Sequence, residues 1–245
     1  MNRYKITVEY DGLPFHGWQR QDGFDTVQQR LEESIFPIAQ AHVTMHGSGR
    51  TDAGVHALGQ VAHFDLANDF ECFRLQECMN AHLVEVPIAV LSIEKVNADF
   101  NARFSALERS YVYKILNRRS KPAIEANRVW HIIQDLDESK MHAAAQHLVG
   151  NHDFSSFRAA GCQSKSPIKT LDRISVRRCT DLIIIEVAAR SFLYHQVRNM
   201  AGSLCLVGGN KWTEQDFVEA FLSKNRTLAG QTAPPCGLYF VGVKY

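Results

Sequence analysis

The sequence predicts an α+β fold made of two ferredoxin-like halves, the first over residues 1–102 and the second over residues 103–245. Strand and helix patterns follow the order β-α-β-β-α-β, and the same order starts again near residue 109 with one helix added. No residue-level repeat is visible, so the expected pseudo-two-fold symmetry is architectural. We expect antiparallel or mixed sheets with helices on one face, and a catalytic cleft between the halves.

The first half opens with a strand at residues 4–10, where apolar and polar side chains alternate. Asp25 or Thr26, followed three positions later by a glutamine, predicts a capping box at the start of a helix. This helix has an apolar face of Val27, Leu31, Ile35 and Ile38. The remaining elements expected here are strands at 42–46 and 59–66, a helix at 70–83 and a β-branched strand at 87–96.

The second half repeats the pattern after a joining segment near 97–107. The elements predicted for it are a strand at 109–116, a helix at 139–149, a hairpin of 171–178 with 182–188, helices at 193–207 and 213–223, and a closing strand at 237–245.

Composition points to a soluble cytoplasmic protein. Hydrophobic residues make up 45% and charged residues 22% of the chain, and no apolar stretch approaches the ~20 residues of a membrane span. The N-terminus has no apolar segment of the secretory type, so we expect a cytoplasmic location. The six cysteines form no CxxC pair and are expected to be reduced thiols.

Positive charge is concentrated in the middle of the chain. Residues 1–102 hold 7 Lys+Arg against 14 Asp+Glu, whereas residues 103–198 hold 16 against 9. This basic block, which includes Arg173 and Arg177, either grips a polyanion or forms a solvated face that balances the acidic first half.

The stretch "HGSGRTDAGVHALGQ" at residues 46–60 places Arg50 and Asp52 among residues with almost no side chain. Its glycines do not form GxGxxG, and GxxxxGK[ST] occurs nowhere, so a nucleotide cofactor is not expected. Asp52 is then either a turn-forming residue or a catalytic carboxylate at the mouth of a cleft.

Three histidines, His46, His56 and His63, surround this stretch. Their spacing matches no zinc pattern and HExxH is absent, so we expect no metal site. A metal-dependent hydrolase built on these histidines and Asp52 is kept as an alternative, and it predicts that a chelator abolishes activity.

Two further residues suggest chemistry. Arg198 lies on the mostly apolar helix "LYHQVRNMAGSLCLV", where a charge needs an anionic partner or a wet cleft because an unpaired buried charge is costly. Tyr111 lies on the strand "ERSYVYKI" and is either a core residue or an aromatic platform for an extruded base.

These motifs resemble those of the TruA family of tRNA pseudouridine synthases. The likeness is carried by "GSGRTDAGVHALGQVAHF", "YDGLPFHGWQRQ", "RSYVYKI" and "FLYHQVRNMAGSL", in the order of the family. The resemblance implies a homodimeric isomerase without cofactor or metal, which converts uridines 38, 39 and 40 in the tRNA anticodon arm to pseudouridine.

The resemblance also assigns residues. Asp52 matches the essential aspartate, Arg50 its neighbouring arginine, Tyr111 the active-site tyrosine and Arg198 the late basic residue, so we expect Asp52 and Arg198 to form an ion pair. Arg50, Tyr111, Arg173 and Arg177 are the expected tRNA-binding residues. An RNA-binding protein of the same fold without catalysis remains the alternative, and it predicts RNA affinity without product.

Overall fold

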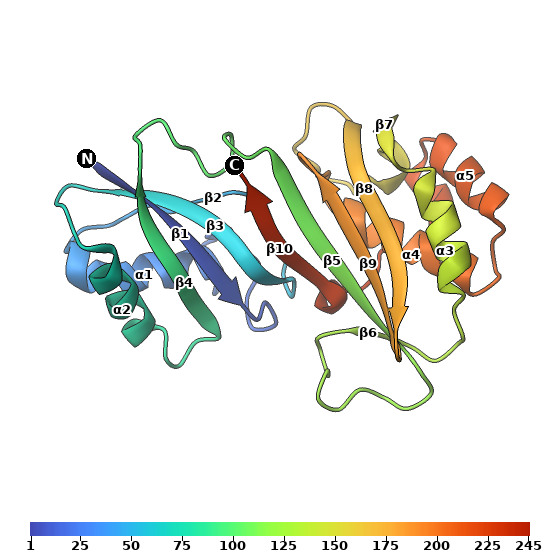
Figure 1. The fold of residues 1–245 in the computed structure, drawn as a ribbon, viewed down its shortest axis with the longest axis horizontal. Helices are drawn as coiled ribbons and strands as arrows, with labels where there is room; N and C mark the ends of the chain where they lie inside the picture. The colour runs from blue at the N-terminus through green and yellow to red at the C-terminus, as the bar shows by residue number, and fades with distance from the viewer. The chain divides into compact units, whose positions relative to one another are not determined.

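The computed structural model describes residues 1–245, and these form two compact units (Figure 1). The first unit contains residues 1–107 and 239–245, and the second contains residues 108–238. The boundary was predicted after residue 102, and the first stretch of the first unit runs to residue 107. The closing strand, however, was expected in the second half and belongs to the first unit, where it pairs in parallel with the strand that starts at His56.

The first unit is a sheet with two helices. Its elements are β1 (Asn2–Tyr10), α1 (Val27–Ala39), β2 (His46–Gly47), β3 (His56–Leu66), α2 (Cys72–His82), β4 (Ile88–Val96) and β10 (Leu238–Lys244). The strand order is β4-β1-β3, and both β2 and β10 pair with β3. Helices α1 and α2 lie side by side (Figure 1). Alternate residues of β1 are buried, as the pattern at 4–10 predicts.

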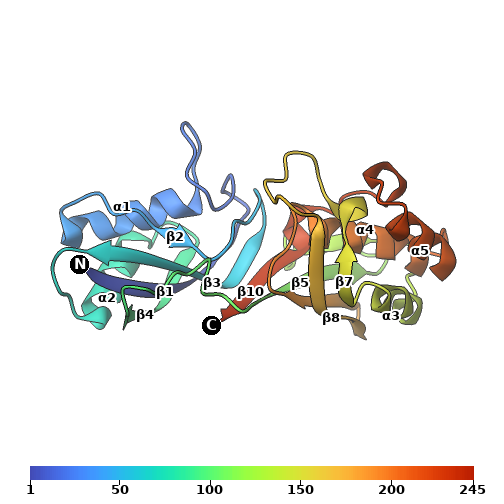
Figure 2. The same cartoon turned by 90° about the horizontal axis from the view of Figure 1, so that it is seen from above.

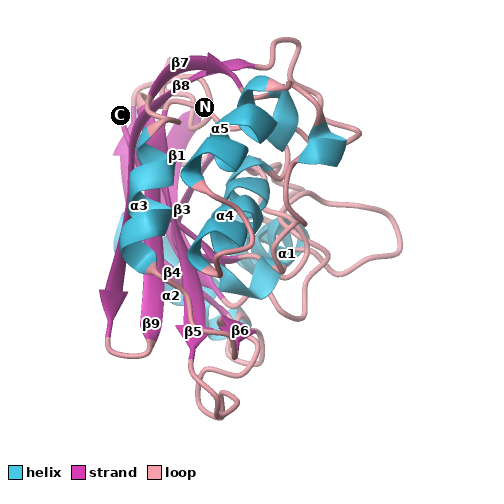
Figure 3. Ribbon diagram, turned by 90° about the vertical axis from the view of Figure 1, so that its right-hand side faces the viewer, coloured by secondary structure: helices cyan, strands magenta, loops and turns pink.

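The second unit is a sheet with three α-helices. Its elements are β5 (Glu108–Asn117), β6 (Trp130–Ile132), α3 (Glu138–Gln146), β7 (Gly150–Asp153), β8 (Ile168–Cys179), β9 (Leu182–Ala189), α4 (Gln196–Gly208) and α5 (Glu214–Leu222), with short 3₁₀ turns at Ser155–Phe157, Arg226–Leu228 and Pro235–Gly237. The strand order is β5-β9-β8-β7, all antiparallel, and β6 adds a parallel pair with β5. Figure 3 shows α3, α4 and α5 on one face of these strands. The predicted α+β class with antiparallel and mixed sheets is confirmed.

The start of α1 differs from the prediction. Thr26 is the N-cap residue, but its side chain makes no capping bond, and its buried hydroxyl has no hydrogen-bond partner. Asp25 instead forms a bidentate ion pair with Arg30, at 2.6 and 2.7 Å. The predicted capping box is therefore wrong, because the Asp25 carboxylate pairs with Arg30 and the Thr26 hydroxyl makes no bond to the helix.

The strand expected at 42–46 is also wrong. Only His46–Gly47 forms a strand, because the backbone of Met45 bonds to side chains of α1 rather than to a neighbouring strand. The Met45 carbonyl accepts a hydrogen bond from Gln28 Nε2 at 3.0 Å, and its amide donates to Glu32 Oε1 at 3.0 Å. Hydrogen bonds to side chains of α1 thus replace the strand pairing that was expected for Met45.

Helix α4 begins at Gln196, three residues later than predicted. His195, the residue before it, is left-handed with φ of 59°, and the Gln196 side chain accepts a hydrogen bond from Leu193 N at 2.7 Å. Residues 193–195 therefore form a turn that leads into the helix. No helix of the structure combines the length and apolar character needed to cross a bilayer.

Candidate active site

Asp52 lies in the loop between β2 and β3, in the first unit. Its carbonyl accepts a hydrogen bond from Val55 N at 3.1 Å, and Gly54 inside this turn has a positive φ of 77°. Asp52 is half-buried and Arg50 is exposed. Arg50 Nε donates to Gln19 Oε1 at 3.0 Å. A backbone hydrogen bond of Asp52 therefore closes this turn.

A buried polar scaffold holds this loop. Gln60 is fully buried, accepts a hydrogen bond from Ser48 Oγ at 2.7 Å and donates to the Gly49 carbonyl at 3.0 Å. On the other side, the hydroxyls of Tyr10 and Thr51 lie 2.7 Å apart. Burial raises the pKa of Tyr10 to about 12, so this hydroxyl stays neutral. The scaffold fixes the residues on both sides of Arg50 without using a charged group.

Close packing between this loop and the N-terminal motif "FHGWQR" explains why glycine occurs at the points of contact. A Cβ on Gly47 would lie 2.6 Å from the indole of Trp18. A Cβ on Gly17, where φ is +90°, would lie 2.6 Å from the Thr51 carbonyl, and Trp18 N donates to that same carbonyl at 3.1 Å. The "GSGRTD" and "FHGWQR" motifs therefore form one packed unit in which glycine is required by space.

Two of the three nearby histidines serve the fold of the first unit. His56 Nδ1 accepts a hydrogen bond from Gly12 N at 3.1 Å, and its ring stacks on Tyr239 at 4.8 Å. His63 Nδ1 accepts from Ala102 N at 3.2 Å, and burial lowers the pKa of His63, which favours the neutral ring. No group of three or more His, Cys, Asp or Glu side chains is arranged to hold a metal ion.

Tyr111 and Arg198 lie in the second unit. Tyr111 is half-buried on β5 opposite Val187, and its ring meets that of Phe192 edge-on, with centroids 5.1 Å apart. Arg198 is half-buried near the start of α4. Its Nε donates to the Ala233 carbonyl at 2.8 Å, and its own carbonyl accepts from Ala233 N at 3.2 Å. Arg198 thus tethers the segment that precedes β10.

The second tyrosine of the same strand face, Tyr113, is a core residue. It is fully buried, and its hydroxyl donates to the Pro234 carbonyl at 2.7 Å. Burial strongly raises the pKa of Tyr113, so the phenol stays protonated. Strand β5 therefore carries two tyrosines of different kinds, the buried structural Tyr113 and the more accessible Tyr111.

Arg173 and Arg177 are exposed on β8, and each is paired with a carboxylate of the second unit. Arg173 makes a bidentate pair with Glu108 at 2.8 and 3.1 Å, and Arg177 lies 2.9 Å from Glu186. Much of their charge is therefore balanced locally, a feature that a count of basic residues cannot show.

The predicted site residues are distributed over both units. The first unit holds Asp52 with Arg50, and the second holds Tyr111, Arg198, Arg173 and Arg177. The ion pair between Asp52 and Arg198 stays a prediction. Sequence reasoning missed Gln60 and Thr51, although both lie inside the quoted motif. The available signal was Gln60, because a polar residue in a buried strand needs a hydrogen-bond partner.

We expect Gln60→Ala to loosen the loop that carries Asp52. The change removes the hydrogen bonds that Gln60 makes to the buried Ser48 hydroxyl and to the Gly49 carbonyl, which should lower the free energy of unfolding by about 1–3 kcal/mol. Thermal unfolding measures this loss. The exposed Gln215→Ala serves as the control and should shift stability by less than about 0.5 kcal/mol. Equal stability of the two variants would contradict the scaffold role of Gln60.

The fold and this loop define an α+β protein that presents a carboxylate and an arginine on a rigid, glycine-rich turn. A model of the family described as tRNA pseudouridine synthase matches residues 6–105 and 144–245. The chain is 55% identical over its full length, and over the whole relative, to tRNA pseudouridine synthase A of Rhodospirillum centenum. The identity to the enzyme of the same name from Zymomonas mobilis is 51%, again over the full length of both chains. This chain belongs to the tRNA pseudouridine synthase family, as its motifs predicted.

Proposed function

We propose that this chain isomerises uridine to pseudouridine at positions 38, 39 and 40 of the tRNA anticodon arm. The isomerase class and the tRNA substrate are supported by the family and by relatives that are named for this activity. The observation that carries the proposal is the loop of Asp52, whose backbone is fixed by buried Gln60 and Thr51 so that a carboxylate is presented on a rigid turn. The binding-only alternative is not favoured, because the relatives are named synthases.

In the proposed reaction, the uracil leaves its ribose, turns over and rejoins it through carbon rather than nitrogen. A uridine in or beside a stem must first be flipped out, at a cost of a few kcal/mol. Asp52 then attacks the anomeric carbon, attacks the pyrimidine ring or removes the 2′ proton, and all three routes are chemically admissible. Arg198 is the proposed partner of its carboxylate, and Tyr111 the proposed neighbour of the base.

The proposal is tested with an unmodified tRNA transcript. The protein is incubated with the transcript, with and without EDTA, and pseudouridine is located by carbodiimide mapping or mass spectrometry. Product at positions 38–40 that is unaffected by EDTA supports the proposal. Affinity without product would favour the binding-only alternative, and loss of activity with EDTA would favour the metal-dependent one. We further propose that the protein is a homodimer and that it is cytoplasmic. Analytical ultracentrifugation of the purified chain measures its mass in solution and so tests the dimer.

We expect Tyr111→Phe to leave tRNA affinity nearly unchanged, because the ring can still stack on a base. Turnover should fall by roughly 10²–10⁴-fold if the hydroxyl takes part in proton transfer. Single-turnover rates and filter binding separate these effects. Tyr113→Phe is the matched control, since that hydroxyl bonds to the Pro234 carbonyl and its loss should lower stability rather than turnover. Wild-type turnover of Tyr111→Phe would reduce Tyr111 to a stacking platform.

Charge reversal of both Arg173 and Arg177 to Glu should weaken tRNA binding. Each lost phosphate contact lowers the slope of log affinity against log salt by roughly one unit, so the double variant should lose about two. The ion pairs offer a second, opposite test: Glu108→Gln with Glu186→Gln releases both arginines and should tighten binding. Unchanged affinity and slope in both double variants would identify this part of β8 as a solvated face.

A further inference from the structure

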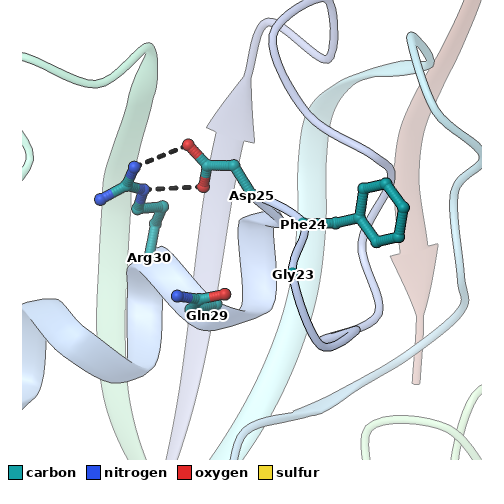
Figure 4. A pocket seen from close by; sticks show the side chains of 5 residues that line it. All are labelled: Gly23, Phe24, Asp25, Gln29 and Arg30. Atoms are coloured by element: carbon teal, nitrogen blue, oxygen red, sulfur yellow. Dashed lines mark hydrogen bonds and ion pairs between the residues drawn. The ribbon is translucent and has the colours of Figure 1, made fainter.

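The segment between β1 and α1 carries an exposed aromatic pair. His16 and Phe24 have ring centroids 4.5 Å apart with a tilt of 45°, and both residues are exposed. Figure 2 shows this segment projecting as a loop beyond α1. In Figure 4 the Phe24 ring points away from the ion pair that follows it in the chain. An apolar ring is therefore presented at the surface of a projecting loop.

The loop holds this ring in place by local bonds. His16 N donates to the Asp25 carbonyl at 2.9 Å, and Phe24 N donates to the Gln21 carbonyl at 3.3 Å. Gln21 and Phe24 form an isolated antiparallel bridge, which the positive φ of Gly23, 79°, makes possible. The Asp25 carboxylate is in turn fixed by Arg30. The ring thus projects from a preorganised turn, and ordering it on binding costs little entropy.

The base of the same loop is bonded to the loop of Asp52. Gln19 Oε1 accepts the hydrogen bond from Arg50 Nε, and the Trp18 amide bonds to the Thr51 carbonyl. All of these residues belong to the first unit, so the aromatic pair and Asp52 are carried by one packed body. The aromatic pair and the loop of Asp52 are therefore held in a fixed arrangement relative to each other.

The charge near the aromatic pair decides which part of RNA can bind there. Asp22 is exposed beside it, Arg20 of the same loop is paired with Glu32 at 2.9 Å, and Arg30 of the helix is paired with Asp25. A carboxylate repels phosphate, whereas an exposed ring offers its face to a base. The surface thus favours a base over the backbone.

We propose that the His16–Phe24 pair stacks on an unpaired nucleobase of the tRNA, other than the uridine that is modified. Proteins that recognise RNA loops commonly stack the unpaired bases on aromatic side chains such as Phe and His. The inference rests on the proposed function for its substrate, and it adds a positioning contact to the Asp52 loop. The contact acts on tRNA binding and leaves the chemical step unchanged.

The chain offers a matched control for the test. Phe36, on α1, is 47% exposed like Phe24, and its ring lies 5.5 Å from that of His42, also tilted by 45°. Phe24→Ala should raise KM and Kd for tRNA by roughly 5- to 100-fold with little change in kcat, because one stacking contact is lost. Phe24→Tyr should restore binding, and Phe36→Ala should behave as wild type.

A fluorescent reporter gives a readout independent of activity. Phe24→Trp should show quenched fluorescence when unmodified tRNA is added, and Phe36→Trp should not. Equal behaviour of the two positions in both the binding and the fluorescence experiments would overturn the inference. If the wild-type protein forms pseudouridine while Phe24→Ala binds tRNA normally, only the stacking contact fails. If quenching occurs at position 24 but no pseudouridine forms, the RNA contact stands and the proposed function fails.

Discussion

Replacing Asp52 by Asn is expected to abolish pseudouridine formation while the chain still folds and binds tRNA. The amide keeps the size of the side chain, and the turn is closed by the Asp52 carbonyl, which the change preserves. What is lost is the negative charge that a nucleophile or base requires. Turnover should fall by at least roughly 10²–10⁴-fold.

Single-turnover assays with excess protein measure this loss, and filter binding with the same transcript reports affinity. Asp135→Asn is the matched control, because Asp135 is an exposed carboxylate of the second unit. It should retain wild-type rates. An Asp52→Asn protein that still forms pseudouridine would remove Asp52 from the chemistry and leave it as a turn residue.

Arg198→Ala should lower both activity and stability. The change removes the hydrogen bond from Nε to the Ala233 carbonyl, which is worth about 1.5–3 kcal/mol for a charged donor. If Arg198 also pairs with Asp52 in a buried site, the stranded carboxylate raises the total loss to ~3–5 kcal/mol. Urea unfolding of the variant therefore distinguishes a local tether from a buried ion pair.

Arg226 supplies the control for the purely structural part of this effect. It also holds the segment before β10, donating to the Gly230 carbonyl at 2.9 Å and to Thr232 Oγ1 at 2.9 Å. Arg226→Ala should destabilise the chain and leave turnover of the folded protein intact, whereas Arg198→Ala should lose turnover as well. Equal turnover of the two folded variants would restrict Arg198 to the tether.

The sequence predicted the elements whose apolar periodicity is strong. The alternating strand at residues 4–10, the helix face that contains Leu31 and the hairpin of β8 and β9 all follow from side-chain pattern, because burial of one face determines them. The family membership was likewise predictable, since its motifs occur as continuous stretches of chain.

Predictions failed where a side chain replaced a backbone partner. The Met45 backbone bonds to Gln28 and Glu32, and Gln196 caps its own turn, so the expected strand and helix start are displaced. The short strands β6 and β7 were missed because three or four residues carry too little pattern. The polar scaffold of Gln60 was missed because its partners are defined only once β3 and the loop are folded.

The pairing of β10 with β3 has a consequence for the order of folding. The first unit needs residues 239–245, which the ribosome adds only after the whole of residues 108–238. At about 5–20 residues per second this delay is roughly 7–26 s. During that time His56 lacks the ring of Tyr239, and the Lys244 carbonyl has not yet met the amide of Leu107. The part of the chain that carries Asp52 is thus begun first and finished last, so a nascent chain cannot complete that unit's sheet before its C-terminal strand has emerged.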